Sequence, residues 1–126
     1  MFVVFLAVLA INYSEATCPY GTITTGVSST EQTLIVNLHN NVRLKVARGT
    51  VPNQPRGINL KKLYWNACLA SEAQRIANSC VFASQTATCP TWSKIGQILY
   101  IVKSTSSSNR NSDWTSVITS WYNEYK

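Results

Sequence analysis

The sequence is poor in acidic residues and in histidine. Its 126 residues include five Asp and Glu, one histidine (His39) and eleven Lys and Arg, which give a formal net charge of +6. A zinc site needs several converging ligands, and the four cysteines contain no C-x-x-C pair. We therefore expect no metal and no other cofactor, and we interpret a lone helical histidine as a packing residue.

Runs of like charge are also absent. Lys61 and Lys62 are the only adjacent basic residues, and the sequence has no run of five or more residues of like charge. A nucleic-acid-binding protein typically carries a basic stripe, so we expect no nucleic-acid partner. The net charge indicates solubility and, at most, weak association with acidic glycans or anionic membrane surfaces.

The one long apolar run lies at the start of the chain. Residues 2–11 are apolar, and Ser14, Glu15 and Ala16 follow them. This pattern is typical of a secretory signal peptide that is cleaved after Ala16. The run is shorter than the roughly 20 apolar residues that cross a bilayer. We therefore predict a leader at residues 1–16 and a secreted, extracellular protein with no membrane span, beginning at Thr17.

Four cysteines follow the predicted leader, namely Cys18, Cys68, Cys80 and Cys89. In an oxidising compartment an even number of cysteines favours disulfides. Four cysteines allow three connectivities. The residues alone therefore predict two disulfides without choosing between the pairings.

Three segments show helical periodicity. Ser28 and Glu31 fit a capping box ahead of the first segment, and Gly49 fits its end. Asn66 fits the N-cap of a second helix that runs to Cys80. Asp113 precedes a third helical pattern, which continues to the last residue. The apolar faces are formed by Leu34, Ile35, Leu38, Val42 and Val46, by Leu69, Ala70, Ala73, Ile76 and Ala77, and by Val117, Ile118, Trp121, Tyr122 and Tyr125.

A single segment has the composition of a strand. Residues 95–103, IGQILYIVK, are rich in β-branched and aromatic residues. Together with the three helices, this strand predicts an α+β fold in which helices pack on a sheet. One strand has no ladder partner, and the last helical pattern has no stop signal. We therefore expect the sequence to be a fragment of a longer protein.

Four segments together resemble the CAP superfamily, which includes cysteine-rich secretory proteins, venom antigen 5 and plant pathogenesis-related proteins. The similarity is strongest to the antigen 5-like proteins of arthropod venom or saliva. The segments are LHNNVRLKVARG (38–49), NLKKLYWNACLASEAQRIANSC (59–80), GQILY (96–100) and WYNEYK (121–126). The resemblance implies a three-layer α-β-α sandwich, incomplete at its C-terminal end, over residues 31–126 after a lead-in at 17–30.

The resemblance also implies roles for the residues of these segments. It suggests that His39, Asn40 and Arg43 tie the first helix to neighbouring backbone, and that Trp65 and Gln74 serve packing. For the cysteines it favours a Cys18–Cys80 disulfide. Cys68 lies off the common pattern, and could pair with Cys89 or stay free.

The central cleft of the family usually holds two histidines and two glutamates. Matched position by position, Ser84 stands at the first histidine, Gln97 at the first glutamate and Glu124 at the second glutamate. Serine is a poor zinc ligand, and Gln97 keeps an acceptor oxygen but no charge. Ile98 replaces a further polar residue. The second histidine would lie beyond residue 126.

These matches predict a secreted protein that is not an enzyme. A hydrolase needs a general base near its nucleophile, but the chain lacks a G-x-S-x-G motif and has only His39 as a base. We therefore expect a non-catalytic, venom allergen 5-like protein that binds a host or prey protein, lipid or glycan. The alternative is a CAP-type hydrolase or metal-binding protein whose site is completed by sequence beyond this chain.

Overall fold

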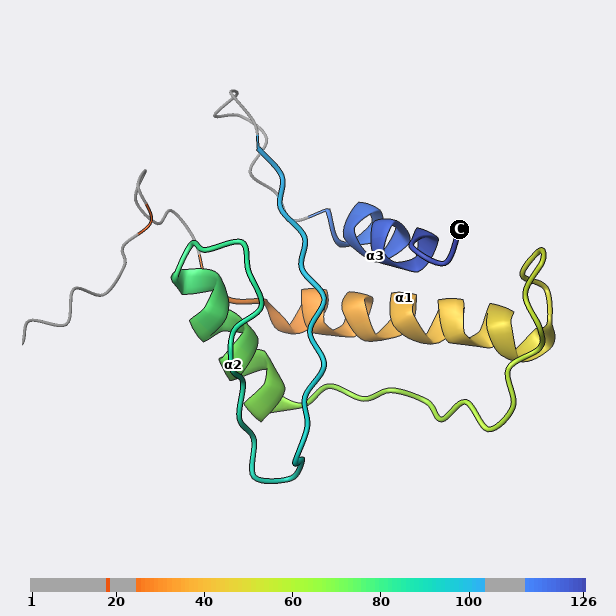
Figure 1. The fold of residues 1–126 in the computed structure, drawn as a ribbon, viewed down its shortest axis with the longest axis horizontal. Coiled ribbons are helices and arrows are strands. Elements are labelled where there is room, and N and C mark those ends of the chain that lie inside the picture. Colours follow the sequence, from red (N-terminus) through yellow and green to blue (C-terminus); the bar gives the residue numbers. More distant parts are fainter. Residues whose placement is uncertain (1–17, 19–24, 104–112) are drawn as a thin grey trace, which may run out of the picture.

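The computed structural model describes residues 18, 25–103 and 113–126. Three α-helices lie within these ranges: α1 (Ser29–Arg48), α2 (Ala67–Asn78) and α3 (Trp114–Asn123). Long irregular segments follow α1 and α2, at residues 49–66 and 79–103 (Figure 1). The predicted leader, and the lead-in apart from residues 18 and 25–30, lie outside the described residues.

The predicted boundaries of α1 are confirmed. The Ser28 hydroxyl accepts from the backbone N–H of Glu31 at 3.2 Å, and the Glu31 carboxylate accepts from the backbone N–H of Ser28 at 2.8 Å. This reciprocal pair is the capping box. At the other end Gly49 has φ 70°, a left-handed conformation in which a side chain would be strained, and its N–H donates to Lys45 and Val46 carbonyls.

The starts of α2 and α3 are also as predicted. The side chain of Asn66 accepts from the N–H of Leu69 at 3.0 Å, and that of Asp113 accepts from the N–H of Ser116 at 3.1 Å. The Ser116 hydroxyl, and then its N–H, lower the pKa of the Asp113 carboxyl. The predicted ends are too late. Helix α2 ends at Asn78, since Cys80 has φ 53°, and α3 ends at Asn123.

The predicted strand at 95–103 is wrong. In the described part of the chain, β-pairing is limited to an isolated bridge between Cys89 and Trp92. A strand forms only when a neighbouring strand takes up its backbone donors and acceptors, and residues 95–103 have no such neighbour here. The helix content agrees with the expected α+β fold, but the sheet, and with it the three-layer α-β-α sandwich, is not confirmed.

Helices α1 and α3 lie side by side and run in the same direction (Figure 1). The indole N–H of Trp114, in the first turn of α3, donates to the Glu31 carboxylate in the first turn of α1 at 3.1 Å. Two turns further along, the rings of His39 and Trp121 have their centroids 6.2 Å apart. Ile118, between the two tryptophans, is only 4% exposed.

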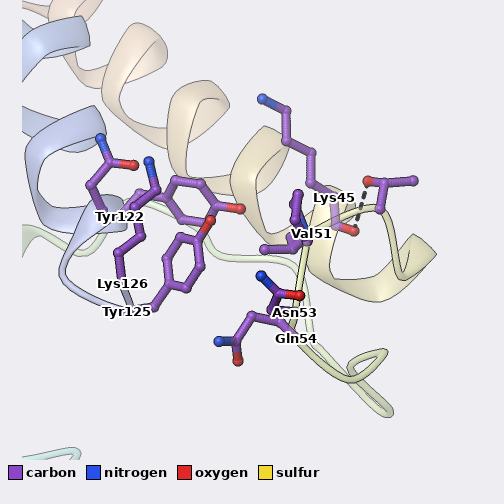
Figure 2. Close-up of a pocket in the computed structure, with 10 residues that line it drawn as sticks. Lys45, Val51, Asn53, Gln54, Tyr122, Tyr125 and Lys126 are labelled. Carbon is purple, nitrogen blue, oxygen red and sulfur yellow. Dashed lines mark hydrogen bonds between the residues drawn. The ribbon is translucent and has the colours of Figure 1, made fainter.

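Beyond this contact the two helices end together beside a pocket. The pocket lies between the last turn of α1, the loop that follows it, and the end of α3 (Figure 2). Val51 of that loop is buried and contributes to the lining. The contact between α1 and α3 is therefore apolar around Ile118. Near the C-terminal ends of both helices the pocket lies between them and the loop after α1.

Candidate functional site

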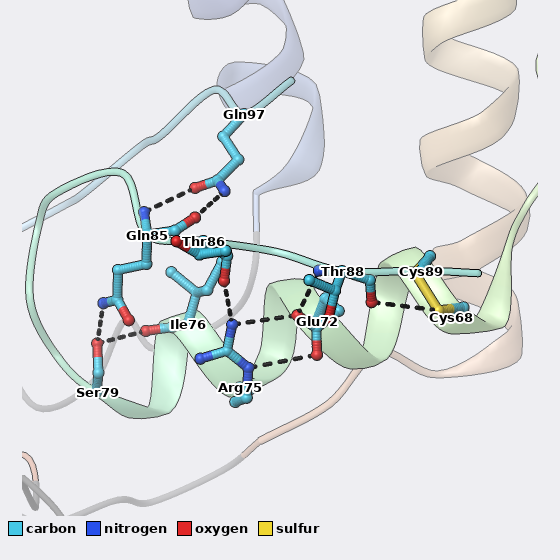
Figure 3. A network of polar contacts seen from close by, with 10 residues as sticks. All are labelled: Cys68, Glu72, Arg75, Ile76, Ser79, Gln85, Thr86, Thr88, Cys89 and Gln97. Carbon is cyan, nitrogen blue, oxygen red and sulfur yellow. Dashed lines mark hydrogen bonds and ion pairs between the residues drawn. A yellow bond between two sulfur atoms is a disulfide. The ribbon is translucent and has the colours of Figure 1, made fainter. Parts of the chain in front are cut away.

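The loop after α2 carries the first of the predicted cleft residues. Ser84 is exposed, and in the described part of the chain its hydroxyl makes no hydrogen bond. The next residue, Gln85, is held by Gln97. The Gln97 amide accepts from the backbone N–H of Gln85 at 3.1 Å and donates to the backbone carbonyl of Gln85 (Figure 3). The structure thus brings Ser84 and Gln97 to one place.

Helix α2 fixes this loop through a polar network (Figure 3). Glu72 pairs with Arg75 at 3.1 Å and accepts from the N–H of Thr88 at 3.0 Å. Arg75 also donates to the carbonyl of Thr86 at 2.6 Å. The ion pair thus satisfies one backbone carbonyl, that of Thr86, and one backbone N–H, that of Thr88. These bonds hold the loop along the side of α2.

Disulfides hold the same region at two further points. Cys68, in the first turn of α2, bonds to Cys89 with a Cα–Cα distance of 6.0 Å. Cys80, just after α2, bonds to Cys18 with a Cα–Cα distance of 5.2 Å. The two predicted disulfides are therefore present, in the pairing that the family resemblance favours, with Cys68 bonded rather than free.

The ion pair makes the stability of this loop sensitive to acid. The hydrogen bond from Arg75, and then that from Thr88, lower the pKa of the Glu72 carboxyl below its ordinary value of 4.5. A lowered pKa in the folded state means that the carboxylate stabilises the fold above the unfolded-state pKa. This stabilisation is lost as the pH falls through the folded-state value.

We expect the substitution Glu72→Gln to show this dependence. At about pH 7 the variant should unfold at a lower urea concentration than the wild-type chain, and at about pH 3 the two midpoints should converge. Far-ultraviolet circular dichroism against urea measures both midpoints. Glu124→Gln is the matched control, since Glu124 makes no ion pair in the described part of the chain. A Glu72→Gln difference that stayed constant with pH would contradict the assignment.

The predicted structural block of α1 contacts the segment that leads to α2. The Asn40 amide donates to the carbonyl of Leu63 at 3.0 Å and accepts from its N–H at 2.8 Å. The Arg43 guanidinium donates twice to the carbonyl of Lys61, at 2.9 and 2.6 Å. Backbone groups of Lys61 and Leu63, in an irregular segment, are thus satisfied by two side chains of α1.

The other residues of the block also make local contacts. One ring nitrogen of His39, Nδ1, lies 2.8 Å from the carbonyl oxygen of Ile35, one turn earlier. Gln74 accepts from the N–H of Gly26 at 2.8 Å and donates to the side chain of Asn78 at 2.7 Å. The indole of Trp65 is partly exposed at 36%.

Glu124, the third predicted cleft residue, lies apart from this loop. It caps the C-terminal end of α3 and is exposed. No hydrogen bond or ion pair joins it to Ser84 or Gln97 within the described ranges. Helix α3 does contact the segment that carries Gln97, because the Trp121 indole donates to the carbonyl of Leu99 at 3.1 Å.

The sequence analysis missed the pocket at the ends of α1 and α3. Six of its lining residues are Lys45, Val51, Asn53, Tyr122, Tyr125 and Lys126. The tyrosine rings have their centroids 5.1 Å apart, and the Lys126 ammonium lies 6.0 Å from the centroid of Tyr125 (Figure 2). Residues 43–62 contain six basic residues and no acidic one, but only Lys45 of these lines the pocket, so the charge pattern alone did not locate it.

A family model, the Cysteine-rich secretory protein family or CAP, matches residues 36–126. This match covers more than half of the chain and includes α2, α3 and most of α1. The chain belongs to the CAP family. Among curated proteins, this CAP chain is 37% identical to Venom allergen 3 of Solenopsis invicta over 107 residues. That alignment covers 80% of the chain and 44% of the relative.

Further relatives come from other venomous arthropods. The chain is 31% identical over 118 residues to CRISP/Allergen/PR-1 of Trittame loki, covering 90% of the chain and 28% of the relative. It is 32% identical over 103 residues to Venom allergen 5 of Tityus serrulatus, covering 79% and 25%. The chain thus spans less than half the length of these CAP relatives. No solved structure matches it.

The residues present do not suit the metal that a CAP cleft with two histidines could hold. Among the residues that the structure describes, no three side chains of His, Cys, Asp or Glu lie together. Ser84 and Gln97 offer a neutral hydroxyl and a neutral amide. The absence of a cofactor stays a prediction.

None of the described helices is long and apolar enough to cross a bilayer.

Proposed function

We propose that this CAP chain is an exported, non-catalytic protein that acts by binding an extracellular macromolecule. The observation that carries the proposal is the hydrogen bonding of Gln97. At the position of the first cleft glutamate, its amide both donates to and accepts from the backbone of Gln85. An amide has no acidic proton to exchange, so a group in this position cannot act as a general acid or base.

The chain's histidine and the cleft serine support the same proposal. His39 packs against Trp121 and directs Nδ1 at a backbone carbonyl, which suits a structural role. A serine needs an adjacent base to become a nucleophile. Within the described residues, Ser84 has no hydrogen-bonded base. Its exposed position on a fixed loop suits contact with a partner better than chemistry.

Exposed apolar side chains supply surface for such contact. Ile58 and Tyr64, between α1 and α2, are 80% and 77% exposed. Phe82, beside Ser84 on the loop after α2, is 58% exposed. Contiguous apolar patches that remain accessible mark surfaces used in association, and we propose that these side chains contribute to such a surface. We propose that the partner is a host or prey protein, lipid or glycan.

Expression in insect cells with the natural leader tests this proposal. We expect protein in the medium that begins at Thr17 and gains about 4 Da on reduction, two hydrogens for each disulfide. The purified protein should bind saturably to plates coated with extracellular matrix. It should hydrolyse peptide and ester substrates no faster than its Ser84→Ala variant, and retain no zinc in equilibrium dialysis.

Other outcomes would overturn it. Retention of the leader, or accumulation of the protein inside the cells, would contradict export. Hydrolysis that Ser84→Ala abolishes would establish the hydrolase alternative. Stoichiometric zinc binding would establish a metal-binding protein, and non-saturable retention on the matrix would contradict a specific partner.

A further inference from the structure

The pocket at the ends of α1 and α3, here called the α1/α3 pocket, has the dimensions of a small-ligand site. Its volume is about 700 Å³, within the range of 300–1,000 Å³ that is typical of ligand sites. It is partly open to solvent. A ring of a longer chain molecule could therefore enter it while the rest of that molecule remained outside.

The lining combines aromatic rings with hydrogen-bonding groups. Tyr122 and Tyr125 form a tilted pair, with an angle of 49° between the ring planes. Asn53, Gln54 and Asn123 add three amides, each with two donors and an acceptor. Aromatic faces pack against the C–H groups of a sugar ring, while amides bond its hydroxyls. This combination suits a carbohydrate better than an acyl chain.

Tyr122 lines the pocket, and its phenol can donate and accept hydrogen bonds. Burial, followed by the neighbouring Tyr125, raises the pKa of the Tyr122 phenol above its ordinary value of 10.0. A phenol at its ordinary pKa is already protonated at neutral pH, and the raised pKa keeps it so. It can donate to a hydroxyl or an anionic oxygen of a ligand.

The charge of the pocket selects the kind of carbohydrate. The Lys45 and Lys126 side chains line it, and neither forms an ion pair with a carboxylate in the described part of the chain. The chain segment that contains Lys45, residues 43–62, holds six of the eleven basic residues and no acidic residue, although of these six only Lys45 lines the pocket. Such a local excess of positive charge attracts anions and raises their local concentration.

The backbone carbonyls at the C-terminal end of a helix carry partial negative charge, which would oppose an anion here. In α1 three of these carbonyls accept hydrogen bonds from the loop that follows. The carbonyl of Lys45 accepts from both the N–H and the hydroxyl of Thr50, at 3.1 Å each. The carbonyl of Val46 accepts from the N–H of Gly57 at 2.9 Å, and that of Ala47 from Arg56 at 2.8 Å. The last turn of α1 therefore presents cations to the pocket rather than bare carbonyls.

We propose that the α1/α3 pocket binds a sulfated glycan. A sugar ring packs on Tyr122 and Tyr125, and sulfate groups pair with Lys45 and Lys126. This inference rests on the proposed function, because it names the class of extracellular macromolecule that the protein binds. A membrane surface is the less favoured occupant, since the lining carries amides and hydroxyls around a single aliphatic core residue, Val51.

Binding of a fully sulfated heparin hexasaccharide, measured by isothermal titration calorimetry, tests the proposal. We expect Lys45→Gln/Lys126→Gln to raise the Kd by about tenfold or more, because charge-assisted contacts are lost. The matched control is Lys94→Gln/Lys103→Gln, which removes the same charge from exposed positions outside the pocket and should raise the Kd by no more than about twofold. Tyr125→Leu should weaken binding with no change in charge.

Three results would overturn the proposal. Equal losses in the two double-lysine variants would mean that net charge alone attracts the glycan. Equal affinity for a desulfated hexasaccharide would remove the role of sulfate. Stronger, Lys45- and Lys126-dependent binding to phosphatidylserine vesicles would make the pocket a membrane contact. Far-ultraviolet circular dichroism checks that every variant is folded.

The same measurements separate this inference from the proposed function. If the wild-type chain binds matrix-coated plates but not the hexasaccharide, the glycan assignment fails and the proposed function stands. If it binds neither, both fail. If heparinase treatment of the plates abolishes binding in step with the hexasaccharide result, both are supported.

Discussion

Replacing Cys68 and Cys89 together by alanine should lower the free energy of unfolding by about 2–5 kcal/mol. The disulfide closes a stretch of 21 residues. Closing a loop of that length restricts the unfolded chain by about 3 kcal/mol in the chain-entropy model. Cys89 is also only 4% exposed, so alanine leaves a small void. Urea unfolding followed by far-ultraviolet circular dichroism measures the loss.

An exposed residue of the same loop provides the control. Ser84→Ala should change the free energy of unfolding by no more than about 0.5 kcal/mol, as is usual for a surface position. A loss of less than about 1 kcal/mol in the double cysteine variant would contradict the prediction. It would mean that the Glu72–Arg75 network holds the loop to α2 equally well without the covalent bond.

The second large effect should come from Ile118. The side chain is 4% exposed in the contact of α3 with α1, and Ile118→Ala should destabilise the chain by about 2–5 kcal/mol, through lost burial and the cavity that remains. Ile118→Val removes one methylene and should cost about 0.5–1.5 kcal/mol. The same urea titration measures both variants.

The neighbouring residue tests whether this effect belongs to the helix contact. Thr119 is exposed on the same helix, and Thr119→Ala should have an effect within about 0.5 kcal/mol. If Ile118→Ala and Thr119→Ala were equally mild, α3 would not be packed on α1 in solution.

The features that the sequence predicted correctly depend on short-range chemistry. The Ser28–Glu31 capping box, Gly49 and Asn66 act on backbone groups within three or four positions, so the local sequence is sufficient to locate them. The end of α2 was misplaced by two residues because Cys80 adopts a left-handed conformation, which side-chain periodicity does not reveal.

The features that the sequence did not predict depend on distant partners. A strand composition at 95–103 cannot create the neighbouring strand that a sheet requires. The pairing of Gln97 with Gln85 joins two segments twelve positions apart through backbone groups, which carry no residue-specific signal. The α1/α3 pocket combines Lys45 and Val51 with Tyr122, and only the packing of α1 on α3 brings these residues together.

The bond between Trp114 and Glu31 has a consequence for how the protein folds. Its partners are 83 positions apart, and contacts of such long sequence separation slow folding because a large loop must close before they form. Helix α1 can nucleate early from its own capping box, but it can pack against α3 only after the chain has been synthesised as far as Asn123. Until then the side of α1 that carries His39 stays exposed to other nascent chains, so the yield of native protein should depend on how soon α3 is synthesised after α1.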